Sequence, residues 1–102
     1  MSGEKIFKTF LTEFEEFLEN LERELENAKS GKEINVFEIF RAFHTFKGSG
    51  ALFEFNKFVA FSEKYTEHWR PIKDEKKLSL ENVQLLEKLI SELKEFKNNF
   101  KL

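Results

Sequence analysis

Three features of the sequence predict an all-α fold, an antiparallel up-down-up-down four-helix bundle. The 102-residue chain contains only one proline and four glycines, the two residue types that most disfavour helix interiors. Its apolar residues recur at steps of three and four, which places them on one face of a helix. Fourteen phenylalanines supply apolar area for a core without polar groups that need partners. Four helices with short connections favour antiparallel neighbours, so we expect residues 1–102 to form a single domain.

The first helix is expected from Phe7 to Ala28. Glu, Lys, Arg and Asn fill most of the gaps in its apolar pattern, so a single stripe is buried. Gly31 suits the left-handed conformation that often follows the last residue of a helix, so the helix should end at Ser30–Gly31. Because the stripe ends at a glycine, packing within the chain is favoured over a long coiled coil. Its members are Phe7, Leu11, Phe14, Leu18, Leu21, Leu25 and Ala28.

The second helix should begin after Asn35, a plausible N-cap, and continue to Phe53. Gly48 and Gly50 interrupt this pattern, and a turn between two helices is the alternative reading. Because Phe53 keeps the helical phase of the apolar residues before the glycines, we expect an unbroken helix. Those residues are Val36, Ile39, Phe43 and Phe46.

Two further helices complete the bundle. Asn56 is the expected cap of the third, and Pro71 should stop or kink that helix at Arg70. The charged run 73–77 is expected to be a solvated linker, and Ser79 is the expected N-cap of the fourth helix. The third helix buries Phe58, Val59, Ser62, Tyr65 and Trp69, and the fourth buries Val83, Leu86, Leu89, Ile90, Leu93, Phe96 and Phe100.

Composition excludes several classes of function. A net charge of −2 lacks the clustered basic residues that bind phosphate backbones, so nucleic acid is not an expected partner. The chain has no cysteine, hence no disulfide and no thiolate nucleophile. Its two histidines and scattered carboxylates form no metal-binding motif, so no metal site is expected. Because no apolar run approaches the roughly 20 residues of a membrane span, we expect a soluble cytoplasmic protein without membrane insertion.

The segment 41–50 is unusual because it places a histidine, a lysine and two glycines in a helical pattern. Violations of local helix preference tend to occur at functional sites. His44 falls opposite the apolar stripe and should face outward, with Arg41 one turn before it. Lys47, Gly48 and Ala51 follow at i+3, i+4 and i+7, on or beside the same face.

Three phenylalanines are expected on the same side as His44. By helical phase Phe37, Phe40 and Phe55 project toward His44 rather than toward the main stripe. If they remain partly exposed, they form an apolar docking patch for a partner protein, together with Ala51.

The residue types around His44 suit phosphoryl chemistry. A neutral imidazole is nucleophilic through Nε2, and a hydrogen bond accepted from Nδ1–H fixes its tautomer. Lys47 is a mobile charge that can neutralise a phosphoryl group, and Gly48 leaves room for a partner's active site to approach. An ordinary surface histidine is the alternative interpretation of His44.

The run 39–48 resembles the phosphoacceptor segment of histidine phosphotransfer (HPt) domains, most closely the N-terminal domain of chemotaxis-type histidine kinases. The shared pattern is H-x-x-K-G with a basic residue three positions earlier, on the second helix of a four-helix domain. The resemblance implies that His44 is the phosphorylated residue, that Lys47 and Arg41 support phosphoryl handling, and that Gly48 provides clearance.

The sequence departs from chemotaxis kinases on the third helix. Those kinases use a histidine and a glutamate there to orient the acceptor imidazole, whereas this chain has Glu63 and Thr66 at the corresponding positions. Three candidates for the orienting group remain: Glu63, Glu67 after a small rotation of the helix, or a water molecule.

The resulting hypothesis is a phosphoryl-carrier module and not an enzyme. His44 would accept a phosphoryl group from a kinase ATP-binding domain or a receiver aspartyl phosphate and pass it to a receiver aspartate. The chain has no Gly-rich phosphate loop, so Mg²⁺ and ATP are expected on the partner domains and the chain itself should bind no cofactor. We expect a monomer. The alternatives are a helical interaction module without covalent chemistry and a small helix-turn-helix DNA binder.

Overall fold

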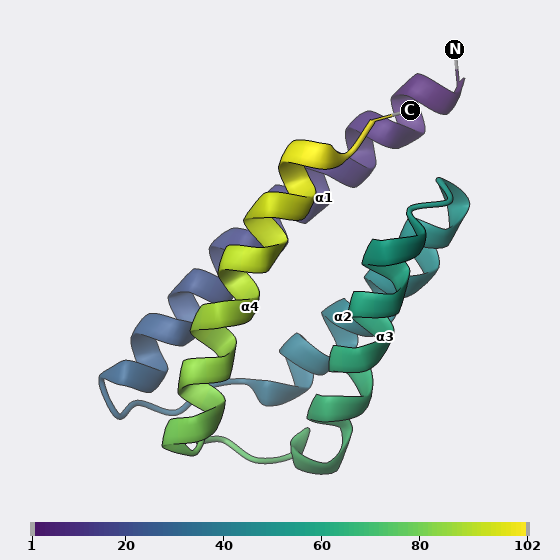
Figure 1. Cartoon of the computed structure of the whole chain (residues 1–102). Coiled ribbons are helices and arrows are strands. Elements are labelled where there is room, and N and C mark those ends of the chain that lie inside the picture. The colour runs from purple at the N-terminus through teal and green to yellow at the C-terminus, as the bar shows by residue number, and fades with distance from the viewer. Residues whose placement is uncertain (1, 102) are drawn as a thin grey trace.

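Four antiparallel helices make up the fold, as the sequence predicts. The computed structural model describes residues 2–101, within which no strand occurs. Helices α1 (Ser2–Lys29), α2 (Val36–Leu52), α3 (Asn56–Trp69) and α4 (Leu80–Asn99) run alternately up and down the bundle (Figure 1). A single 3₁₀ turn, η1 (Arg70–Ile72), follows α3. The bundle is elongated, with extents of 45 × 22 × 19 Å.

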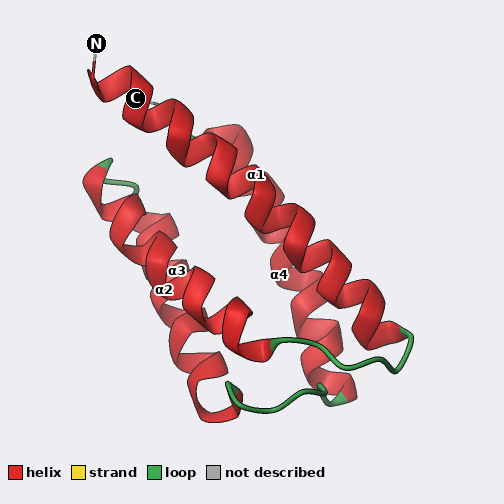
Figure 2. Ribbon diagram, turned by 180° about the vertical axis from the view of Figure 1, so that it is seen from behind, coloured by secondary structure: helices red, strands yellow, loops and turns green. Residues whose placement is uncertain are grey.

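The helices associate as two pairs. Helices α2 and α3 form a hairpin, and α1 lies beside α4 with its first turns extending past the end of that hairpin (Figures 1 and 2). Three lysine–glutamate ion pairs join α1 to α4, at N···O distances of 2.6, 2.8 and 3.2 Å. Because all three are solvent-exposed, each contributes little to stability, about 0–1 kcal/mol. They are Lys29–Glu87, Lys94–Glu22 and Lys97–Glu15.

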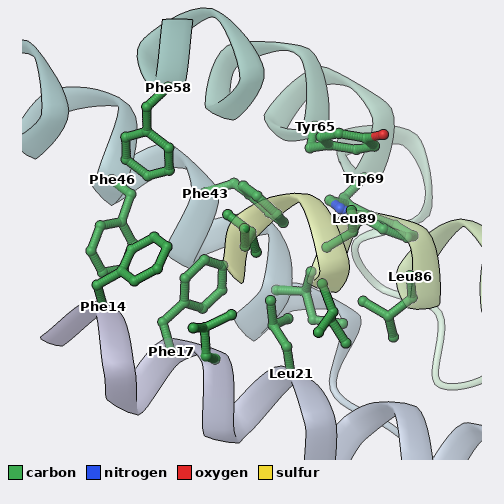
Figure 3. Packing of buried hydrophobic residues seen from close by; sticks show 14 of the residues in the cluster. Phe14, Phe17, Leu21, Phe43, Phe46, Phe58, Tyr65, Trp69, Leu86 and Leu89 are labelled. Atoms are coloured by element: carbon green, nitrogen blue, oxygen red, sulfur yellow. The ribbon is translucent and has the colours of Figure 1, made fainter. Parts of the chain in front are cut away.

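Aromatic side chains dominate the core between the two pairs. Phe14 of α1, Phe43 of α2 and Trp69 of α3 are completely buried. Figure 3 shows these rings between the helices, with Leu86 and Leu89 of α4 closing the core. Phe14 meets the rings of its neighbours edge to face, a favourable geometry for aromatic pairs. The apolar stripes predicted from the sequence thus meet in one core, except that Val59 and Val83 are only half-buried and lie outside it.

Most predicted helix ends are confirmed. The Asn35 side chain accepts the backbone N–H of Glu38 at 3.1 Å, and Ser79 Oγ accepts that of Asn82 at 3.2 Å. Gly31, with φ +75°, adopts the left-handed conformation predicted after α1. The prediction for Asn56 was wrong, since Asn56 is the first residue of α3 and the cap position belongs to Phe55.

Helix α2 runs unbroken through both glycines but ends at Leu52, before Phe53. The backbone N–H groups of Phe53 and Phe55 both donate to the carbonyl of Gly50, at 3.2 and 3.1 Å. Between them Glu54 adopts φ 58°, a left-handed conformation that is uncommon for a non-glycine residue. The chain therefore reverses direction within three residues, and the helical phase of α2 does not extend to Phe55.

Helices α2 and α3 approach each other closely at Gly50. A Cβ atom at this position would lie 2.9 Å from Cδ2 of the buried Phe58 ring and 3.3 Å from Val59. Gly50 itself is buried, whereas Gly48 has open space where a Cβ would be. The two glycines of the motif thus have different structural roles.

Pro71 ends α3 as predicted, and the chain continues for one 3₁₀ turn through Arg70 and Ile72. The following linker, 73–77, is solvated as predicted, since residues 74–77 are exposed. The backbone N–H of Ile34 donates to the carbonyl of Lys76 at 2.8 Å, which fastens the linker to the α1–α2 connection.

Candidate functional site

His44 is exposed in the middle of α2, as its helical phase predicts. Lys47, one turn later, is half-buried, and Gly48 and Ala51 are exposed beyond it. An added Cβ at Gly48 would meet no atom within 4 Å, so the space one turn from the imidazole is open. The face continues to Leu52, which is 76% exposed at the end of the helix.

Two phenylalanines lie on the other side of His44. The imidazole stacks on the Phe40 ring, with centroids 6.3 Å apart and an interplanar angle of 25°. Phe37 lies one turn earlier, 6.1 Å from Phe40 between centroids. Phe37 is exposed and Phe40 is half-buried, so both remain accessible to a partner, as expected.

Each of these rings carries a cation from the segment after α3. The guanidinium carbon of Arg70 lies 5.0 Å from the Phe40 centroid, and Nζ of Lys73 lies 5.9 Å from that of Phe37. Both distances are in the range of cation–π interactions. The positions of these two cations could not be predicted from the apolar sequence pattern. Pro71 is the residue that could have indicated them. A proline that ends α3 places the residues around it beside the start of the antiparallel α2.

Glu67 is the carboxylate that the structure brings toward His44. Its Oε2 accepts from Nη2 of Arg70 at 2.9 Å, and Nε of Arg70 lies 3.3 Å from both carboxylate oxygens. The pKa of Glu67 is lowered, chiefly by this hydrogen bond and, against some desolvation, by the charges of Arg70, Lys47 and His44. Glu67 is therefore within electrostatic range of both His44 and Lys47.

Neither of the other two positions on α3, Glu63 and Thr66, forms a hydrogen bond to the imidazole within residues 2–101. Glu63 is exposed and forms no hydrogen bond or ion pair within residues 2–101. Thr66 is 1% exposed, and its hydroxyl donates to the carbonyl of Ser62 at 2.7 Å. The residue that orients the imidazole thus stays a prediction, and Glu67 is the candidate whose pKa responds to the charge of His44.

Arg41 lies on the opposite flank of α2. It lines the groove between α1 and α2 together with Thr45, and its Nη2 pairs with Glu38 Oε2 at 2.6 Å. This ion pair raises the pKa of Arg41. The structure thus separates Arg41 from the flank of α2 where Phe40 contacts Arg70 of η1.

Phe55 is not near His44, and the expected placement was wrong. Its ring stacks on Phe100 with centroids 4.8 Å apart and also contacts Phe53 and Phe10, in the aromatic end of the bundle. The prediction fails because the helical phase of α2 does not continue past the turn at Glu54.

The second histidine, His68, bridges α3 to α4 through Asn82, with Nε2 and Oδ1 2.8 Å apart.

Residues 2–101 contain no group of three or more His, Cys, Asp or Glu side chains placed to hold a metal ion. None of the helices in this range is long and apolar enough to cross a membrane.

Comparison with protein families gives one match, to the family described as Hpt domain, over residues 5–96. No curated protein and no solved structure shows a significant match. The matched range includes most of all four helices and the whole of the His44 face. Hpt domains are helical modules that work with kinases and receiver domains. The chain belongs to this family of phosphocarriers, which serve phosphotransfer in phosphorelay signalling.

Proposed function

We propose that His44 is the phosphoacceptor of this Hpt domain. It takes a phosphoryl group from a chemotaxis-type kinase ATP-binding domain, or from a receiver aspartyl phosphate, and passes it to a receiver aspartate. The observation that supports this most directly is the exposed imidazole beside Lys47, with open space at Gly48. His68, in contrast, is engaged by Asn82.

The transfer needs no catalytic group of this chain other than the imidazole. The Nε2 lone pair forms the nitrogen–phosphorus bond, the bond from phosphorus to the donor oxygen breaks, and that oxygen leaves with the electron pair. Nδ1 keeps its proton, so the ring becomes positively charged as the bond forms. Reversal of these steps on a receiver carboxylate returns a neutral imidazole. Mg²⁺ and ATP belong to the partner domains in this proposal.

Lys47 and Glu67 act on the two charges that this step creates. Lys47 lies one turn from His44 and offers an ammonium group to the phosphoryl oxygens. Glu67, within electrostatic range of the imidazole, stabilises the positive ring and is the candidate to accept from Nδ1–H. Arg41 supports the site only indirectly, because its guanidinium pairs with Glu38.

The partner docks on the exposed face of α2. Phe37 and Phe40 supply apolar contact on one side of His44, and Ala51 and Leu52 supply it on the other. Gly48 lies between them without a side chain. A receiver or kinase domain can thus surround the imidazole and exclude water from the transfer. Such partners would place the protein in the cytoplasm as a monomeric carrier.

Replacing His44 with Gln should abolish phosphorylation and leave the fold intact, because the side chain is exposed. The protein is treated with phosphoramidate, and separately with a chemotaxis-type kinase domain and Mg-ATP. Acid-labile phosphate is then located by mass spectrometry. His68→Gln is the matched control and should retain full uptake. Phosphate on neither histidine, in folded wild-type protein, would favour a noncovalent interaction module instead.

Replacing Glu67 with Gln should slow uptake from phosphoramidate about three- to tenfold, since the ring loses the carboxylate that stabilises its developing charge. Glu63→Gln removes an equal charge one turn away on α3 and should change the rate less than twofold. Initial rates for the two variants, measured under identical conditions, distinguish the carboxylates. A slow Glu63→Gln with a normal Glu67→Gln would reassign the role to Glu63.

A further inference from the structure

Resting on the proposed function, we infer that Arg70 is a second phosphoryl-holding residue of this domain. Its guanidinium binds Glu67 while His44 is free and moves to the phosphoryl oxygens when His44 is phosphorylated. Arg70 is thus a positioning residue, which the Glu67 carboxylate binds until His44 is phosphorylated.

The contacts place Arg70 one ring away from the imidazole. His44 stacks on Phe40, and the Arg70 guanidinium lies over the same Phe40 ring. Pro71 ends α3 and sets Arg70 in η1, beside the first half of α2. The guanidinium and the imidazole therefore contact the same ring, and the exposed Arg70 side chain needs only to turn from Phe40 toward His44 to reach it.

The present partner of Arg70 is easily exchanged. The side chains of Arg70 and Glu67 are 47% and 62% exposed, and an exposed ion pair contributes little to stability. A phosphoryl group carries about −1.5 to −2 charges near neutral pH and three acceptor oxygens. A guanidinium matches such oxygens with two parallel hydrogen bonds, a geometry that the ammonium of Lys47 does not provide.

Phosphorylation changes the charges around Glu67 in a way that favours the movement of Arg70 from the carboxylate to the phosphoryl group. Before transfer, the hydrogen bond from Arg70 and, more weakly, the charges of Arg70, Lys47 and His44 lower the pKa of the Glu67 carboxyl. After transfer, the new dianion repels the carboxylate and competes with it for both cations. When Arg70 leaves, the acceptor sites of Glu67 become free for the Nδ1–H of the phosphorylated ring.

The test uses the whole domain phosphorylated with phosphoramidate, so that no partner protein is required. A ³¹P NMR titration measures the pKa at which the phosphoryl group on His44 loses its last proton. A cation in contact favours the dianion, so Arg70→Gln should raise this pKa by about half a unit or more. Arg70→Lys keeps the charge and should show a smaller rise. Far-UV circular dichroism confirms that each variant is folded.

Lys73→Gln is the matched control, since Lys73 is also a cation over a phenylalanine of α2 but lies one turn farther from His44. It should leave the phosphoryl pKa unchanged. In the wild type, the ¹H–¹⁵N signal of Arg70 Nε should move on phosphorylation, and it should not move in treated His44→Gln. An unchanged titration in Arg70→Gln, or equal shifts in Arg70→Gln and Lys73→Gln, overturns the inference. Absence of phosphate on wild-type His44 instead overturns the proposed function, and this inference with it.

Discussion

Gly48→Gln is expected to slow phosphoryl uptake from a kinase or receiver domain by about tenfold or more, while uptake from phosphoramidate stays within twofold. The new side chain would fill the open space one turn from His44, where a protein donor must bring its phosphoryl group. A displacement of about 1 Å from the reactive geometry can cost a factor of roughly 100 in rate. The small reagent reaches Nε2 by other directions and is not displaced.

Ser91→Gln on α4 is the control for this result, because it adds a side chain of the same kind at an exposed helical position remote in sequence from the α2 face. Rates are measured by transfer of labelled phosphate from each donor. Equal slowing with both donors would mean that the glutamine disturbs the imidazole itself. Unchanged rates with both would show that the partner does not approach over Gly48.

Gly50→Ala is expected to lower the free energy of unfolding by about 1–3 kcal/mol, the usual cost of overpacking a core. Its Cβ would lie 2.9 Å from the Phe58 ring, which is 1% exposed and cannot move away without displacing its neighbours. Gly48→Ala makes the same chemical change two residues earlier in α2, on a different face of the helix, and should instead raise stability by about 0.5–1 kcal/mol.

Urea unfolding followed by circular dichroism measures both changes, and similar slopes for the two variants keep the comparison valid. Opposite signs would show that Gly50 is needed for the packing of α2 against α3. They would also show that Gly48 is not needed for packing and lowers the stability of the helix. A stabilised Gly50→Ala would mean that α2 and α3 can separate slightly at little cost.

The helices could be predicted from the sequence because their signals are local. Apolar periodicity, the caps Asn35 and Ser79, and the left-handed Gly31 each depend on residues within a few positions. The end of α2 could not be predicted in this way. Glu54 adopts a left-handed conformation that is usually found at glycine or asparagine, so the local sequence shows no sign of a turn. For this reason the helical phase of α2 predicts the wrong position for Phe55.

The part of the candidate site that lies on α2 could be predicted from the sequence. His44, Lys47 and Gly48 share a face of α2 because of their spacing alone. Glu63 and Glu67 share a face of α3 one turn apart, so the choice between them depends on the axial register of α3 against α2, which the turn at 53–55 sets. Spacing within one helix contains no information about that register or about Arg70 in η1.

The division of the bundle into two helix pairs separates chemistry from support. His44, Lys47, Glu67 and Arg70 all come from the segment 44–70, whereas α1 and α4 form the wall behind it and bind each other through exposed lysines and glutamates. Outer positions of α1 and α4 can therefore diverge under separate selection, toward solubility or new contacts, while the reactive surface is inherited unchanged. For an engineer, the same property makes the α1–α4 side the natural place for tags, labels or tethers.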